Sequence, residues 1–126
     1  MKILFADDMK MMRDLVRRIL ERRGHIVETV TDGDELLEKL ASGSRPDLVI
    51  TDNNMIRVNG TDVLWRIRND ERFNDIKTML VIVYSGDNIR EKVEKFGGMF
   101  VQKMVKVDDL FACVDEVAAE IAKKNG

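Results

Sequence analysis

The chain has 126 residues, the length of one domain, and it is long enough to bury a hydrophobic core. Its 44% hydrophobic and 35% charged content is typical of a globular protein rather than a disordered one. The formal net charge of −2 gives no basic excess for nucleic acid or an anionic membrane, and no apolar run approaches the ~20 residues that span a bilayer. The single cysteine, Cys113, favours a reducing, cytoplasmic setting.

Short apolar runs rich in Val and Ile alternate along the chain with segments of helical periodicity. In chain order the predicted strands are residues 3–6, 26–30, 47–51, 79–84 and 99–101. The first predicted helix covers residues 9–23 and ends at Gly24, and the second runs from residues 32–33 to 42–43. Three further helices are marked by apolar stripes at Val63, Leu64 and Ile67, at Ile89, Val93 and Phe96, and at Leu110, Val114, Val117 and Ile121.

This alternation predicts an α/β fold with a doubly wound, five-stranded parallel sheet covered by helices on both faces. No linker or repeat divides the chain, so we expect one domain over residues 1–126 and no output domain. If the strand order is 2-1-3-4-5, the first and third strands are central neighbours. In such open sheets ligands bind at the carboxyl ends of the strands.

Ionic and polar residues stand at four of these predicted strand ends. Asp7 and Asp8 follow the first strand, Asp52 the third, Ser85 the fourth and Lys103 the fifth. Each pair of carboxylates at ~4–5 Å costs about 3–4 kcal/mol at an effective dielectric near 20, so such a cluster persists only if protons, a cation or a fixed positive group neutralises it. Carboxylate oxygens with a nearby carbonyl suit Mg²⁺. The pattern therefore predicts a divalent-cation site with one lysine as a fixed counter-charge.

Each of these residues also has a purely structural interpretation. Asp8 could be the N-cap of the first helix, and Asp52 could be a turn residue leading out of the third strand. Ser85 and the following glycine could form an ordinary turn, and Lys103 could be a solvated surface lysine. The four features together, each at a different strand end, favour a site.

The chain resembles the receiver domain of two-component response regulators over essentially its whole length. The similarity is carried by "ILFADDM" before an amphipathic helix, "DLVITDNNM" with Gly60 eight residues after Asp52, "VIVYSG" and "FVQK". It implies a flavodoxin-like (βα)5 fold and a phosphorylation-activated signalling switch. Activity beyond the domain's own Mg²⁺-dependent phosphorylation and dephosphorylation is not expected, so the chain would not be an enzyme in the usual sense.

The resemblance also assigns roles to residues. It implies that Asp52 is the phospho-acceptor, that Ser85 and Lys103 assist the transfer, and that Ser85 and Phe100 form the switch. The implied ligands of Mg²⁺ (or Mn²⁺) are Asp7, Asp8, Asp52 and the backbone carbonyl of Asn54. Residues implied to tune hydrolysis are Asn54, Gly86 and Asp87.

The implied partners are a sensor histidine kinase or histidine phosphotransfer protein and a downstream target, with output by protein contact of the chemotaxis or phosphorelay type. The surface formed by the fourth helix, fifth strand and fifth helix would change on phosphorylation, and a monomer or weak phosphorylation-dependent dimer is expected. Two positions depart from the family pattern, because Met104 and Ile56 stand where prolines are usual. We predict a trans Lys103–Met104 peptide bond.

Two other functions compete with this interpretation. A degenerate receiver would act as a phosphorylation-independent interaction module, which Met104 and Ile56 favour and the intact acidic residues oppose. A true enzyme on the same architecture would be an aspartate phosphatase, which needs a second acid where Asn54 stands, or a flavin-binding domain, which needs a Gly/Ser/Thr-rich loop where Asp7 and Asp8 stand.

Several remaining residues have simpler interpretations. His25, the only histidine, is expected to be structural, and Trp65 to pack at the rim of the core. Met11 and Leu15 are either the margin of the core or part of an apolar patch offered to the helices of a kinase. Cys113 lies mid-helix among apolar residues and is expected to be an inert thiol.

Overall fold

The computed structural model describes residues 1–52, 55, 58–82, 91, 94, 95, 99–102 and 108–125. Strands and helices alternate along them, as the sequence predicts. The strands are β1 (Lys2–Ala6), β2 (Ile26–Val30), β3 (Leu48–Asp52), β4 (Lys77–Ile82) and β5 (Met99–Gln102). The helices are α1 (Lys10–Arg22), α2 (Gly33–Ala41), α3 (Gly60–Arg68) and α5 (Asp108–Asn125).

The strands form one sheet in the order β2-β1-β3-β4-β5, and every pairing is parallel. The predicted parallel α/β architecture is therefore confirmed. Strand boundaries differ from the prediction by one or two residues, since β1 begins at Lys2, β3 runs from Leu48 to Asp52, β4 begins at Lys77 and β5 ends at Gln102. Most of the predicted fourth helix lies outside the described residues, although Glu91, Glu94 and Lys95 have helical backbone.

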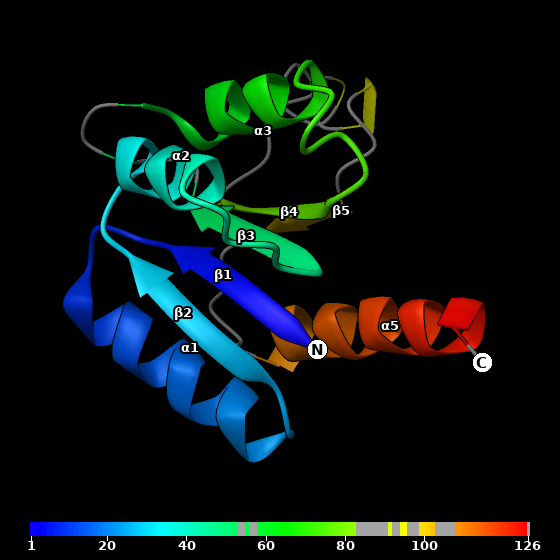
Figure 1. Ribbon diagram of the computed structural model, residues 1–126. Coiled ribbons are helices and arrows are strands. Elements are labelled where there is room, and N and C mark those ends of the chain that lie inside the picture. Colours follow the sequence, from blue (N-terminus) through cyan, green and yellow to red (C-terminus); the bar gives the residue numbers. More distant parts are fainter. Residues whose placement is uncertain are drawn as a thin grey trace.

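The sheet separates two hydrophobic layers, because successive side chains of a strand point to opposite faces. In Figure 1, α2 and α3 cover one face of the sheet, and α1 and α5 cover the other. The first layer contains Leu36, Leu40, Val63 and Ile67, packed with even-numbered residues of β1. The second layer contains residues of both other helices and the odd-numbered residues of β1, among them Val16, Leu20, Phe111, Val114 and Val117.

Glycine ends α1 and α2 in the same way. Gly24 and Gly43 have φ angles of 91° and 108°, which side-chain-bearing residues rarely adopt. The amide of the residue after each glycine bonds back to the final turn, from His25 to Leu20 at 3.1 Å and from Ser44 to Lys39 at 3.0 Å. These are Schellman motifs, which satisfy terminal carbonyls and turn the chain toward the next strand.

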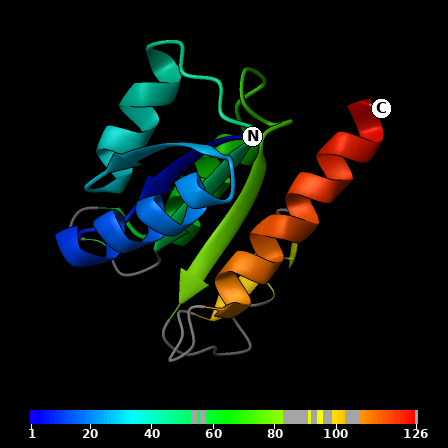
Figure 2. The same ribbon diagram turned by 90° about the horizontal axis from the view of Figure 1, so that it is seen from below.

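Side-chain contacts link α1 and α5 at the surface, beside the second hydrophobic layer. Figure 2 views the molecule from their side and shows both helices lying across the sheet. Arg23, at the end of α1, forms an ion pair with Asp115 of α5 and places its guanidinium 5.4 Å from the centre of the Phe111 ring. Among the described helices, none combines the length and apolar character required to cross a membrane.

Candidate functional site

The carboxyl ends of β1 and β3 bring two aspartates together at the centre of the sheet. The register pairs Ala6 with Thr51, so Asp7 and Asp52 are the next residues on neighbouring strands. Asp7 is 1% exposed and Asp52 is 3% exposed. The amide of Asp7 also donates to the carbonyl of Val30 at 3.2 Å, which continues the ladder between β1 and β2. The backbone thus holds both carboxyl groups at the expected edge.

A tight turn after β1 fixes the Asp7 side chain. Its carboxylate accepts a hydrogen bond of 2.9 Å from the amide of Met9, and its own carbonyl accepts one of 2.8 Å from the guanidinium of Arg13. The α1 N-cap is Met9, with no side-chain hydrogen bond to the helix. The N-cap interpretation of Asp8 is therefore wrong, and Asp8 extends toward the cluster instead.

Asp7, Asp8 and Asp52 each offer a carboxylate oxygen, and these three oxygens lie within 4.8 Å of one another. Asp52 belongs to β3, so its interpretation as a turn residue is also wrong. At 4.8 Å and an effective dielectric of 20, each pair of charged carboxylates repels by about 3–4 kcal/mol. Folding has nevertheless collected all three, two of them buried.

The donor set fits a small divalent cation. Mg²⁺ prefers oxygen ligands at about 2.0–2.1 Å in an octahedral arrangement, so ligand oxygens on opposite sides are about 4 Å apart. The 4.8 Å limit on the three oxygens is close to that span, and Asp8 is exposed, which leaves an approach from solvent. This edge of the sheet therefore has the chemistry and spacing of a divalent-metal site.

The other predicted site residues fall largely outside the described part of the chain. The residues outside the described part are Asn54, Ser85, Gly86, Asp87 and Lys103. The two departures from the family pattern, Ile56 and Met104, also lie outside it, and so does the predicted trans peptide bond. Phe100 is in β5, where its backbone pairs with Leu80. The register also places Asp52 beside Val81 and Val81 beside Val101, so β3, β4 and β5 end at one edge.

An apolar patch on α1 is exposed beside the acidic residues. Met11 is 78% exposed, Leu15 is 37% exposed, and Met9, which the sequence did not single out, is 52% exposed. The interpretation of Met11 as a margin of the core is therefore wrong. The hydrogen bond from Arg13 to the Asp7 carbonyl was not predicted either. One feature of the sequence points to it, because Arg13 lies one turn inside the helix that follows the acidic pair.

The remaining singled-out residues lie away from the acidic edge. The His25 imidazole Nδ1 is 3.0 Å from the terminal amino group of Met1, at the opposite end of the sheet. Cys113 is half-buried, and burial raises the pKa of its thiol, which disfavours a reactive thiolate. Trp65 is 53% exposed on α3 and borders a surface groove.

The fold and the site define a doubly wound α/β domain with an acidic centre at its two middle strands. Residues 3–115 match the model of the response regulator receiver domain family. The chain belongs to this family, whose members are signal-receiving domains of two-component systems.

Individual relatives agree with this assignment. The chain is 34% identical over 87 residues to the chemotaxis protein CheY1 of Helicobacter pylori, covering 68% of this chain and 70% of that protein. The crystal structure of the response regulator TrrA from Thermotoga maritima, in complex with Mg²⁺–BeF, is 30% identical and has a TM-score of 0.78, covering 92% of this chain and 97% of that one. The chemotaxis protein CheY4 of Vibrio cholerae is 25% identical, with a TM-score of 0.82 and the same coverage.

Proposed function

We propose that this receiver domain is a phosphorylation-activated switch in which Asp52 accepts a phosphoryl group from a phosphohistidine on another protein. The proposal is supported chiefly by the cluster of Asp7, Asp8 and Asp52, whose oxygens lie within 4.8 Å of one another. A cation bound by these carboxylates would offset their repulsion and attract a phosphoryl group to Asp52. The Mg²⁺–BeF complex of the related TrrA gives the same indication for that protein.

Mg²⁺ (or Mn²⁺) would be held by Asp7, Asp8, Asp52 and the backbone carbonyl of Asn54, and when bound it would neutralise charge on the phosphoryl oxygens. A carboxylate oxygen of Asp52 attacks the phosphorus atom in line. A P–O bond to Asp52 forms as the P–N bond to the donor histidine breaks, and the histidine nitrogen leaves with the electron pair. Arg13 and the Met9 amide fix Asp7 through this step, because both bond to it directly.

Lys103 and Ser85 are assigned to the phosphoryl group in this proposal. Lys103 directly follows β5 in the sequence, and β5 ends at the same edge of the sheet as Asp52. Its ammonium group would neutralise the phosphoryl oxygens beside Asp52, and the Ser85 hydroxyl would hydrogen-bond to one of them. Phe100 would follow Ser85 and alter the surface around β5 and α5. Asn54, Gly86 and Asp87 would set the rate at which water removes the phosphoryl group.

The partners in this proposal are proteins. The exposed apolar side chains are Met9, the N-cap of α1, and Met11 and Leu15 on that helix, which begins beside the acidic cluster, so a kinase or phosphotransfer helix docked there would bring its histidine to Asp52. Output would occur by protein contact, of the chemotaxis or phosphorelay type. The domain would catalyse only its own phosphorylation and dephosphorylation.

Incubation with acetyl phosphate tests the chemistry without needing the natural kinase. In Mg²⁺, intact-mass spectrometry should show the addition of one phosphoryl group, and hydroxylamine should remove it because acyl phosphates are labile to this nucleophile. Chelation by EDTA and the Asp52→Asn substitution should each abolish the addition.

Two controls sharpen the result. Asp32→Asn changes another aspartate near the carboxyl end of the sheet that is not in the cluster, and it should leave phosphorylation intact. If wild-type protein gains no mass, or if Asp52→Asn gains as much as wild type, the switch proposal is wrong. A phosphorylation-independent interaction module would then be the better description.

A further inference from the structure

A surface groove between α2 and α3 lies on the face of the sheet opposite α1 and α5. It has a volume of about 460 Å³, within the range of pockets that hold small ligands or a few side chains. Its wall is mostly apolar and comes from both helices and the loop after α3. The residues that form it include Leu37, Ala41, Trp65, Arg66, Arg72 and Phe73.

Trp65 is the most unusual member of this groove. It is the only tryptophan of the chain, and 53% of it is exposed. Nothing in the fold requires a tryptophan there, because Val63, Leu64 and Ile67 supply the buried side of α3. Exposed tryptophan beside apolar surface is a feature of protein-binding sites, where Trp and Arg are the commonest sources of binding energy.

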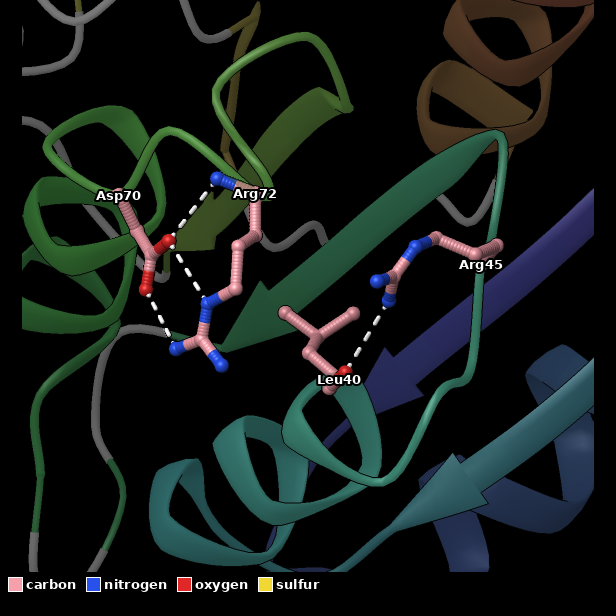
Figure 3. A network of polar contacts seen from close by, with 4 residues as sticks. All are labelled: Leu40, Arg45, Asp70 and Arg72. Carbon is pink, nitrogen blue, oxygen red and sulfur yellow. Dashed lines mark hydrogen bonds and ion pairs between the residues drawn. The ribbon is translucent and has the colours of Figure 1, made fainter.

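The charges around the groove are predominantly positive. Arg72 is paired with Asp70 at 2.8 Å, and the two lie against each other in Figure 3. Arg66 makes no ion pair, not even with Asp62 one turn earlier, within the part of the chain that the structure describes. The lining of the groove therefore contains one carboxylate and two guanidinium groups, although the formal net charge of the protein is −2.

A third arginine, Arg45, lies against Phe73 but lines other hollows of the surface. Arg45 donates to the carbonyls of Leu40 and Ser44, as Figure 3 shows for Leu40, and it forms no ion pair with any residue that the structure describes. The guanidinium groups of Arg45 and Arg72 lie 5.2 and 4.7 Å from the centre of the Phe73 ring. Stacking on this ring and the ion pair with Asp70 hold the Arg72 guanidinium in place, so an arriving anion would meet Arg66, which has no ion pair to a described residue.

We propose that this groove binds an acidic segment of a partner protein that carries one large apolar side chain. The apolar side chain would fill the space between Leu37, Trp65 and Phe73, and a neighbouring carboxylate would meet Arg66. A protein segment fits better than a polyanion, because DNA or an anionic membrane would face the net negative charge of the chain beyond the local patch. The surface is separate from α1 and α5, so it can be occupied while the acidic edge is in use.

A selection from a phage-displayed library of random peptides, made on the whole unphosphorylated protein, tests the proposal independently of the proposed switch. We expect the enriched peptides to combine Asp or Glu with one large apolar residue. A synthetic copy of one such peptide should move the emission of Trp65 to shorter wavelength and protect it from acrylamide, because Trp65 is the only tryptophan.

Substitutions then locate the binding. Arg66→Glu should weaken the peptide at least about tenfold, whereas Arg66→Lys should retain most of the affinity because it keeps the charge. Arg18→Glu, an exposed change on α1 with the same effect on net charge, is the matched control and should leave affinity within about twofold. Trp65→Ala, followed by calorimetry, should lose binding, and Trp65→Phe should keep part of it.

Several outcomes would overturn the proposal. They are an absence of enrichment, enrichment of peptides without acidic residues, and equal loss of affinity in Arg66→Glu and Arg18→Glu. The proposal is also wrong if a single-stranded oligonucleotide or phosphatidylglycerol vesicles bind in place of peptide with the same dependence on Arg66. Circular dichroism of every variant distinguishes loss of binding from loss of fold.

Discussion

The two ends of the parallel sheet differ in how their charged groups are arranged. At the carboxyl end, three carboxylates of like charge lie within 4.8 Å of one another, two of them buried. At the amino end, charged groups have hydrogen-bonding partners: the terminal nitrogens of the Arg68 guanidinium donate to the carbonyls of Asn74 and Ile76, although its Nε is buried without a partner, and the backbone amide of Lys2 donates to the Asp47 carboxylate at 2.8 Å.

This difference separates a functional region from a structural one. A cluster of like charges is stabilised by a cation, by protons or by a fixed positive group, and the three carboxylates at the carboxyl end have the spacing of a divalent-metal site. The arginine at the other end bonds to backbone carbonyls that would otherwise lack partners, so it stabilises the loop before β4. Sensitivity to Mg²⁺ is therefore expected at one end, and sensitivity to loss of hydrogen bonds at the other.

The largest effect is expected for Arg68→Met at the amino end. The Arg68 guanidinium also donates to the Thr78 hydroxyl at 3.1 Å, and burial lowers the pKa of this side chain. Methionine keeps most of the volume but leaves two carbonyls and a hydroxyl without their donor. We expect a loss of about 3 kcal/mol in the free energy of unfolding, measured with urea.

Arg66→Met is the matched control for this prediction. Arg66 is two residues away on the same helix and is exposed, without an ion pair to any described residue. Its replacement should change the free energy of unfolding by less than about 0.5 kcal/mol. Equal effects of the two substitutions would show that helix propensity, rather than the bonds to the loop, determines the result.

The next effect concerns Mg²⁺ at the carboxyl end. A ligand that binds only the folded state stabilises it by about 2.7 kcal/mol at a hundredfold excess over its Kd. We therefore expect Mg²⁺ to raise the free energy of unfolding of the wild-type protein by about this amount. Asp8→Asn removes one ligand and should abolish most of the increase, as thermal unfolding in Mg²⁺ and in EDTA would measure.

Asp32 provides the comparison within the same end of the sheet. It is the N-cap of α2, where its carboxylate accepts a 2.9 Å hydrogen bond from the amide of Glu35. Asp32→Ala should lower the free energy of unfolding by about 1 kcal/mol and leave the response to Mg²⁺ unchanged. A loss of the Mg²⁺ response in this variant would contradict the assignment of the cation to the cluster.

The smallest effect is a dependence on pH at the amino end. Burial, and then the positive charge of the chain terminus, lower the pKa of His25 below its ordinary 6.5, with Asp115 opposing and Arg23 adding to this shift. The unfolded state therefore binds more protons than the folded state, so stability is full above about pH 6.5 and is lost as the pH falls below it.

Urea unfolding at several pH values measures this loss. Because His25 is only partly buried, solvent screening should keep the loss below about 1 kcal/mol. His25→Gln should remove this part of the pH dependence, since glutamine does not titrate. A wild-type curve that parallels the His25→Gln curve between pH 5 and 7.5 would contradict the prediction.

Much of this molecule could be predicted from local pattern. The alternation of apolar runs and amphipathic segments predicted the parallel sheet, and glycines after α1 and α2 marked two helix ends, because backbone geometry limits which residues can stand there. The acidic cluster was also predictable, since Asp7, Asp8 and Asp52 follow directly from strand ends. The roles of Ser85 and Lys103 stay predictions.

Features that depend on side-chain exposure were not predictable. Helical spacing left Met11 either at the margin of the core or in an exposed apolar patch, and only the structure shows it 78% exposed, because the buried stripe of α1 is filled by Val16 and Leu20. Spacing gives the face of a helix but not how far the neighbouring layer extends over it. The N-cap of α1 also depends on the folded structure. The Asp7 carboxylate accepts a hydrogen bond from the Met9 amide, and the helix begins after Met9.

The sequence by itself determined the order of strands and helices and the acidic residues at the carboxyl ends of β1 and β3, because these depend on periodicity and on the geometry of parallel strands. Only the tertiary structure decided how Arg68 and Arg45 are used and where Trp65 stands relative to Phe73 and Arg72. The Arg68 bonds join α3 to the segment before β4, and the stacking of Arg45 on Phe73 joins the segment after α2 to the segment after α3. A long side chain can reach several acceptors, and only the folded arrangement selects among them.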